Sequence, residues 1–266
     1  MAALKTAAPT AKRRTTDMTN ASPLDSAAIE LDGLRHRYDM DDVLRGINLS
    51  IPRGEVFGFL GHNGSGKTTT VNILTTLIRP TAGSARVCGL DVEREPMRVR
   101  QLIGYLPSDI RMYDHMTALE NLEFFARLSG VERPRSAALE TLDYLDCADL
   151  AGKRVGTFST GMRQRIGIAQ AVLHKPVVLF LDEPTAGLDP SGVRHLRETI
   201  QRLNSELGVT IFMNTHQLSE VAKVCTSIGV LNHGELIYTD SIENTTARFP
   251  DEASLEGIYV RVEAGA

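Results

Sequence analysis

The sequence is poor in the features that place a chain in a membrane or outside the cell. Its 266 residues include no tryptophan and only three cysteines, Cys88, Cys147 and Cys225, at widely separated positions. Cysteines without paired spacing indicate reduced thiols rather than a disulfide framework. The longest strongly apolar run, at residues 177–181, is far shorter than the roughly 20 residues of a membrane-spanning helix. We therefore expect a cytoplasmic chain that does not itself cross a membrane.

The sequence also lacks an excess of charge of one sign. It has 29 basic and 33 acidic residues and a formal net charge of −4, so no global attraction to nucleic acid is expected. Residues 1–27 are rich in Ala, Thr, Pro and Ser, a composition typical of a disordered tail. The Arg13-Arg14 pair in this segment is followed by no apolar stretch, which argues against an export signal.

What the sequence does contain is a glycine-rich stretch, GHNGSGKTTT, at residues 61–70. An apolar run at residues 56–60 precedes it, and apolar residues at helical spacing follow it. A strand, a glycine-rich loop and a helix in this order are the context of a loop that cradles phosphates. Lys67 would reach the β- and γ-phosphates of a nucleotide, and the Thr68 hydroxyl would bind Mg²⁺. We expect nucleotide binding by Asn63, Gly64, Ser65, Gly66, Lys67, Thr68 and Thr69.

Two acids, Asp182 and Glu183, end a second apolar strand that we predict at residues 178–181. Charged groups are costly inside a buried strand, but at its carboxyl end they face the crevice where open α/β sheets bind ligands. Two acids in this position are by themselves a common solvated turn, and the phosphate loop is what favours a functional role. Asp182 would hold Mg²⁺, directly or through water. Glu183 would polarise the attacking water as a general base.

The order of apolar strands and amphipathic helices predicts an α/β fold. We expect a phosphate-loop NTPase core with a mostly parallel sheet covered on both faces. Strand-like stretches at residues 29–38 and 47–51 are expected to form N-terminal antiparallel strands. The predicted organisation is a tail at 1–27, an ATPase domain at 28–240 and a short C-terminal extension at 241–266. The ATPase domain is expected to contain a helical subdomain at about 91–160 and a hairpin across 232–234. Within the extension, residues 254–262 fit one helix or strand.

The stretch FSTGMRQRIGIAQAVLHKPVVLFLDEPTAGLDP at residues 158–190 resembles the signature-to-magnesium-strand segment of ATP-binding cassette (ABC) ATPases. The similarity extends from about residue 28 to residue 238. Its most specific part is the serine–glycine signature at Ser159 and Gly161, which the resemblance implies contacts the γ-phosphate of ATP held by a partner subunit. The signature opens a predicted helix, whose positive dipole end suits a phosphate. The ordinary alternative for Ser159 is a plain helix cap.

The resemblance implies roles for three further residues. Tyr38 matches the aromatic residue that stacks on adenine, although a single aromatic is also an ordinary surface strand residue. Asp189 matches the dimer-contact loop, and its alternative is a helix cap before Pro190. His216 matches the switch histidine that hydrogen-bonds the γ-phosphate, whereas a lone histidine after a strand is usually structural.

The sequence departs from the family pattern at three positions. Ser108 stands where a glutamine usually follows a short strand, so the link to Mg²⁺ and water would be weaker or supplied by Asp109. Thr160 replaces the commonest glycine of the signature and restricts the backbone there. Met162 replaces a glutamine and loses a polar contact to nucleotide. We expect ATP hydrolysis to persist, with altered coupling or nucleotide preference.

The resemblance implies an ATP- and Mg²⁺-dependent ATPase subunit of an ABC transporter, on the cytoplasmic face of the membrane. It would form a dimer, expected as a homodimer, and act through a separate transmembrane permease that docks on the helical lobe and on residues 108–116. The sequence LEGIY at residues 255–259 resembles the drug- and sodium-exporting branch.

One alternative to a transporter subunit is a non-transport ABC ATPase of translation or DNA maintenance, which usually has two cassettes or a coiled coil. The other is an inactive regulatory cassette, against which Lys67, Asp182, Glu183 and His216 argue.

Overall fold

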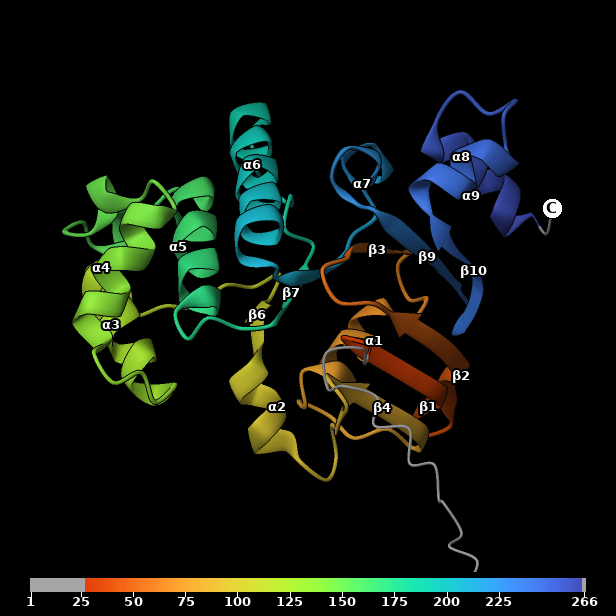
Figure 1. The fold of residues 1–266 in the computed structure, drawn as a ribbon, viewed down its shortest axis with the longest axis horizontal. Helices are drawn as coiled ribbons and strands as arrows, with labels where there is room; N and C mark the ends of the chain where they lie inside the picture. The colour runs from red at the N-terminus through yellow and green to blue at the C-terminus, as the bar shows by residue number, and fades with distance from the viewer. Residues whose placement is uncertain (1–26, 265–266) are drawn as a thin grey trace, which may run out of the picture.

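The computed structural model describes residues 27–264, and it contains two β-sheets (Figure 1). The six-stranded sheet has the order β10-β9-β3-β8-β7-β6, and the four-stranded sheet has the order β2-β1-β4-β5. In the larger sheet β9, β3, β8, β7 and β6 run parallel, and β10 closes one edge antiparallel to β9. The strands are β1 Ile29–Tyr38, β2 Asp41–Ile51, β3 Val56–Leu60, β4 Ala82–Val87, β5 Leu90–Asp91, β6 Ile103–Leu106, β7 Val178–Asp182, β8 Thr210–Asn214, β9 Ser227–Asn232 and β10 Glu235–Ser241.

The helices surround these sheets. Helix α1 contacts strands of both sheets. Helices α3, α4 and α5 lie together beyond the β6 edge, and α8 and α9 lie beside β10 (Figure 1). The helices are α1 Lys67–Leu74, α2 Pro96–Leu102, α3 Ala118–Leu128, α4 Pro134–Tyr144, α5 Thr160–Val172, α6 Pro190–Leu207, α7 Leu218–Val224, α8 Ile242–Arg248 and α9 Leu255–Glu263, with 3₁₀ turns at Ala148–Leu150 and Val155–Thr157.

Both faces of the larger sheet are buried at its central strands β3, β8 and β7, which explains why these strands are largely continuous apolar runs. Every residue of β3, β7 and β8 is buried, as expected for parallel strands covered on two sides. On the face toward α1, the rings of Phe57, Phe59 and Phe180 surround Phe212, with centroids 5.2 to 5.6 Å from it. The predicted fold class is confirmed.

Local sequence signals account for the ends of the helices that carry function. Thr117 and Glu120 form a reciprocal capping box at the start of α3. Ser159 caps α5 through the Met162 N–H, and Asp189 caps α6 just before Pro190 at its first turn. The first turns of α5 and α6 line one cavity.

Several details differ from the sequence-based expectations. Apolar spacing predicted a helix running from the phosphate loop to Ile78, but α1 ends at Leu74 and Thr76 adopts a positive φ of 64°. The segment expected as a helical subdomain, about 91–160, also contains α2 and the core strand β6. The hairpin across 232–234 is present, and residues 254–262 form a helix rather than a strand. The predicted disordered tail at 1–27 lies outside the described residues except for Ala27.

Candidate nucleotide site

The glycine-rich loop joins β3 to α1, as its sequence predicts. Gly64 and Gly66 adopt left-handed φ values of 83° and 108°, which glycine adopts without strain. A Cβ on Gly66 would lie 2.6 Å from the Leu44 side chain. This position therefore requires glycine for space as well as for conformation. The loop packs tightly enough against the four-stranded sheet to hold one shape.

The Lys67 ammonium points back into this loop. Its Nζ donates to the carbonyl oxygens of Gly61 and His62, at 2.7 and 3.1 Å. Burial lowers the pKa of Lys67, while the nearby carboxylates of Glu183 and Asp182 oppose that shift. The lysine is thus poised among the two acids predicted from the sequence, at the place where phosphate oxygens would replace carbonyl oxygens as its partners.

Asp182 ends β7, and its carboxylate is buried next to the end of β8. The Asn214 amide donates to Asp182 Oδ1 at 2.5 Å. Burial raises the pKa of Asp182; the Asn214 hydrogen bond opposes this, Glu183 adds to it and Lys67 opposes it. A buried carboxylate with a raised pKa gains from a divalent cation.

The residues fit a magnesium ion that completes its shell with phosphate oxygens and water. Among the described residues no group of three or more His, Cys, Asp or Glu side chains could enclose a metal. Mg²⁺ usually takes one or two protein carboxylates together with substrate phosphates. Asp182 would supply the carboxylate, and Thr68, an exposed residue in the first turn of α1, would supply a hydroxyl. The buried Ser65 hydroxyl lacks a hydrogen-bond partner.

Glu183 and His216 meet at the mouth of the same crevice. His216 Nδ1 lies 2.9 Å from Glu183 Oε2, and the Thr215 hydroxyl donates to that carboxylate oxygen at 3.3 Å. Glu183 has a φ of 48°, which is strained for a residue with a side chain and typical of functional sites. Its N–H donates to the Asn214 carbonyl at 2.8 Å. The backbone therefore turns the carboxylate out of the sheet toward the histidine.

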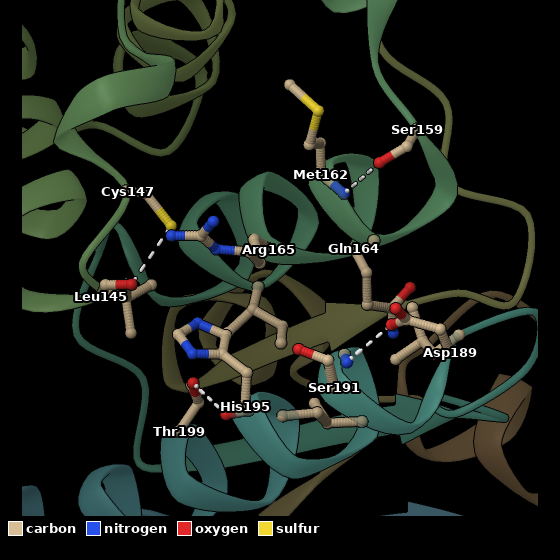
Figure 2. A pocket seen from close by; sticks show the side chains of 15 residues that line it. Leu145, Cys147, Ser159, Met162, Gln164, Arg165, Asp189, Ser191, His195 and Thr199 are labelled. Atoms are coloured by element: carbon tan, nitrogen blue, oxygen red, sulfur yellow. Dashed lines mark hydrogen bonds between the residues drawn. The ribbon is translucent and has the colours of Figure 1, made fainter.

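The signature residues lie elsewhere. Ser159 and Gly161 line a cavity of about 340 Å³ together with Asp189 and side chains of α6, and Lys67 is not part of its wall (Figure 2). Within one chain the structure thus brings together Lys67, Asp182, Glu183 and His216, but it does not bring the signature to the phosphate loop. Gln164 links the two regions, because its amide donates to the Pro184 carbonyl at 2.6 Å.

Tyr38 and Ser108 each follow or end a strand of a different sheet, β1 for Tyr38 and β6 for Ser108. Tyr38 ends β1 with 46% of its surface exposed, and its ring meets the His36 ring edge-on at 4.5 Å. It is free to stack on a flat base. Ser108 is exposed just after β6, which pairs with β7. Asp109, considered as a substitute magnesium contact, instead pairs with Arg111 at 2.8 Å.

Sequence reasoning missed Asn214, Thr215 and Gln164. The first two end an apolar strand immediately before His216, and polar residues at a strand's carboxyl end are the available signal. Gln164 gave no signal, because a glutamine on a helix is usually solvated. Its buried amide makes sense only once α5 is packed against the Glu183–Pro184 turn.

Comparisons with known proteins show the family of this chain. Residues 44–186 fit the family model described as ABC transporter. The chain belongs to the ABC transporter family. This ABC subunit is 41% identical to the ABC transporter ATP-binding protein NatA of Bacillus subtilis (strain 168), over 76% of this chain and 82% of NatA. It is 36% identical to the linearmycin resistance ATP-binding protein LnrL of the same organism, over 79% and 68% of the two chains.

Solved structures give the same assignment for the fold and the reaction. A dimeric post-hydrolysis structure of the ATP-binding cassette MJ0796 with ADP and Pi has a TM-score of 0.73 and 27% identity, and covers 80% of this chain and 98% of that chain. A structure described as the ATP-binding subunit of an ABC transporter has a TM-score of 0.79 and 26% identity, over 89% and 99% of the chains. The protein is an ATP-binding subunit of an ABC transporter and an ATPase. No helix within residues 27–264 is both long and apolar enough to span a bilayer.

Proposed function

We propose that two copies of this subunit form a homodimer that hydrolyses ATP at two composite sites. Each site would combine Lys67, Asp182, Glu183 and His216 of one copy with Ser159 and Gly161 of the other. The observation that carries this proposal is the separation, within one chain, of the signature cavity from the phosphate loop. The dimeric MJ0796 cassette gives a related example of two copies assembling.

The residues of each site have distinct chemical tasks. Backbone N–H groups of the loop and the Lys67 ammonium neutralise phosphate charge. Thr68 and Asp182 would hold Mg²⁺, which would supply positive charge to offset that of the phosphates. Glu183 accepts a proton from the attacking water, and His216 both orients that carboxylate and reaches toward the γ-phosphate. Tyr38 stacks on adenine.

We further propose that this reaction drives export through a separate membrane permease, with the subunit on the cytoplasmic face. Relatives are named for linearmycin resistance, bacitracin transport and daunorubicin resistance, which favours amphipathic, antibiotic-like cargo. An exposed aromatic group supports docking on the helical side: Tyr113 packs against Phe124 and Phe125, with ring centroids 5.2 and 6.2 Å away. Large aromatic side chains of this kind are typical anchors of protein interfaces.

The deciding experiment is Glu183→Gln with ATP and Mg²⁺. This change keeps the shape of the side chain but removes the base, so we expect ATP binding, loss of nearly all turnover and a dimer on size-exclusion chromatography. Normal turnover would refute the assignment of Glu183, and a persistent monomer with bound ATP would refute the composite site. Purification of this subunit with its bound partners from mild detergent extracts distinguishes transport from the non-transport alternative. Recovery of a membrane permease supports transport, whereas recovery of ribosomes or DNA supports the non-transport alternative.

A further inference from the structure

The phosphate loop rests against the hairpin that joins β9 to β10, residues 232–234. The Gly234 N–H donates to the Ser65 carbonyl at 3.0 Å. On the other side of the loop, a Cβ on Gly61 would lie 2.3 Å from the Leu231 carbonyl oxygen. The hairpin therefore touches the loop at two points, and it comes from a part of the chain that contributes no predicted nucleotide contact.

His62 sits between these two points and makes the side-chain contact. Its Nδ1 lies 2.7 Å from the Asn63 carbonyl oxygen, and its Nε2 lies 3.1 Å from Asn232 Oδ1. The His62 ring also packs on the His233 ring, with centroids 4.9 Å apart. Both hydrogen bonds form when the ring carries two protons, or when the Asn232 amide turns its NH₂ group toward Nε2. In either arrangement the imidazole is held on both sides.

We propose that His62 is a positioning residue through which the β9–β10 hairpin holds the phosphate loop in its ATP-receiving shape. The His62 carbonyl accepts from Lys67 Nζ, so a displaced His62 also displaces the lysine. The inference rests on the proposed phosphate site. It extends that site by a supporting residue, Asn232, which is not among the predicted nucleotide contacts.

The test compares the steady-state kinetics of His62→Ala and Asn232→Ala. Each removes one support, so we expect the KM for ATP to rise about fivefold, the usual worth of one hydrogen bond, with kcat changed less than about twofold. The His62→Ala/Asn232→Ala double variant is expected to have the same KM for ATP as the single variant with the higher KM, because both substitutions remove the same contact. Circular dichroism and thermal unfolding establish that each variant is folded.

Tyr238→Phe is the matched control, because it removes a tyrosine hydroxyl bond to Thr245, at 3.0 Å, away from the loop. An unchanged KM in His62→Ala and Asn232→Ala, or effects that simply multiply in the double variant, would overturn the inference. A rise in KM as large in Tyr238→Phe would also overturn it, since the cause would then be general loosening. Lys67→Ala tests the proposed phosphate site separately from the role of His62. If that variant still binds and hydrolyses ATP normally, the phosphate site itself is wrongly assigned.

Discussion

At the scale of single residues, Lys67 is a buried charge in the predicted nucleotide site. Its Nζ donates to two loop carbonyls, yet burial is the largest cause of its lowered pKa. A lysine whose pKa is lower in the folded than in the unfolded state destabilises the fold at every pH below the folded pKa. This cost decreases as the pH rises through the folded pKa and disappears above the unfolded value.

Lys67→Met is therefore expected to stabilise the nucleotide-free protein while abolishing ATP binding. The uncharged side chain fills similar space without the desolvation cost, so we expect the Tm at pH 7 to rise by about 2 °C. Differential scanning fluorimetry with and without Mg²⁺-ATP measures both effects. A lower Tm without nucleotide would mean that the attraction of Lys67 to Asp182 and Glu183 outweighs its burial.

The contact between His216 and Glu183 is a second feature at the scale of single residues. His216→Ala removes the partner at 2.9 Å from the Glu183 carboxylate but leaves the phosphate loop intact. We expect kcat to fall about 100-fold or more, the usual contribution of a positioned acid–base group, while the dissociation constant for ATP changes little. Rapid-quench measurement of phosphate release, beside equilibrium ATP binding, checks this split. An equal loss in binding would assign His216 to nucleotide affinity instead.

Ser108→Gln tests the departure from the family pattern next to β6. Ser108 is exposed, and Asp109 is engaged by Arg111, so the short serine lacks a nearby substitute. A longer amide would extend toward the magnesium region, and we expect a rise in permease-stimulated ATPase activity in reconstituted vesicles. The basal activity of the isolated subunit serves as the internal reference. No change in stimulation would show that the departure is silent.

At the scale of elements, the sequence predicted best where one local signal had one structural outcome. The continuous apolar runs of β3, β7 and β8 indicated buried parallel strands, and the glycine-rich loop indicated the turn between β3 and α1. The end of α1 escaped prediction, because helical spacing continues past Leu74 while the chain turns at Thr76 to reach β4. Tertiary packing, which a periodic pattern does not encode, decides such ends.

In the candidate site, too, residues marked by a local sequence signal were predictable, and residues brought together by tertiary packing were not. Lys67, Asp182 and Glu183 were predictable, because their chemistry is tied to a loop and a strand end that the sequence marks. The contact between His62 and Asn232 was not, since 170 positions separate the two residues. Their proximity follows from the pairing of β9 with β3 in the larger sheet. Support from distant segments becomes visible only in the folded chain.

Helix α3 offers a stability prediction that belongs to an element. Its capping box joins Thr117 and Glu120, with the Thr117 N–H donating to Glu120 Oε2 at 2.8 Å. Thr117→Ala is expected to cost about 1 kcal/mol of unfolding free energy, as for other capping threonines. Urea unfolding measures the change, with Thr246→Ala as control, because the Thr246 hydroxyl bonds only to the Ile242 carbonyl within α8. Equal losses in both variants would argue against the cap.

At the scale of the whole molecule, the proposed dimer would make each ATP depend on two chains. The cavity that holds Ser159 and Gly161 lies apart from Lys67, and the ends of α5 and α6 present it at the surface with Asp189 exposed. A C2 dimer would bring the same two surfaces together twice, so every site would pair one copy's loop with the other copy's signature. Activity should then be a property of the pair rather than of the chain.

This dependence predicts complementation between two inactive variants. Lys67→Ala destroys the loop, and Ser159→Arg puts a bulky charge in place of the exposed signature serine, so either homodimer has no intact site. A mixed dimer has one intact site, formed by the loop of the Ser159→Arg copy and the signature of the Lys67→Ala copy. With random pairing of equal amounts, about a quarter of the wild-type number of sites is restored. ATPase assays of the mixture measure the recovery, and a mixture of Lys67→Ala with Lys67→Met should stay inactive because neither chain has a loop. Recovery only in the first mixture is expected from sites shared between chains, whereas sites complete within one chain would leave both mixtures equally inactive.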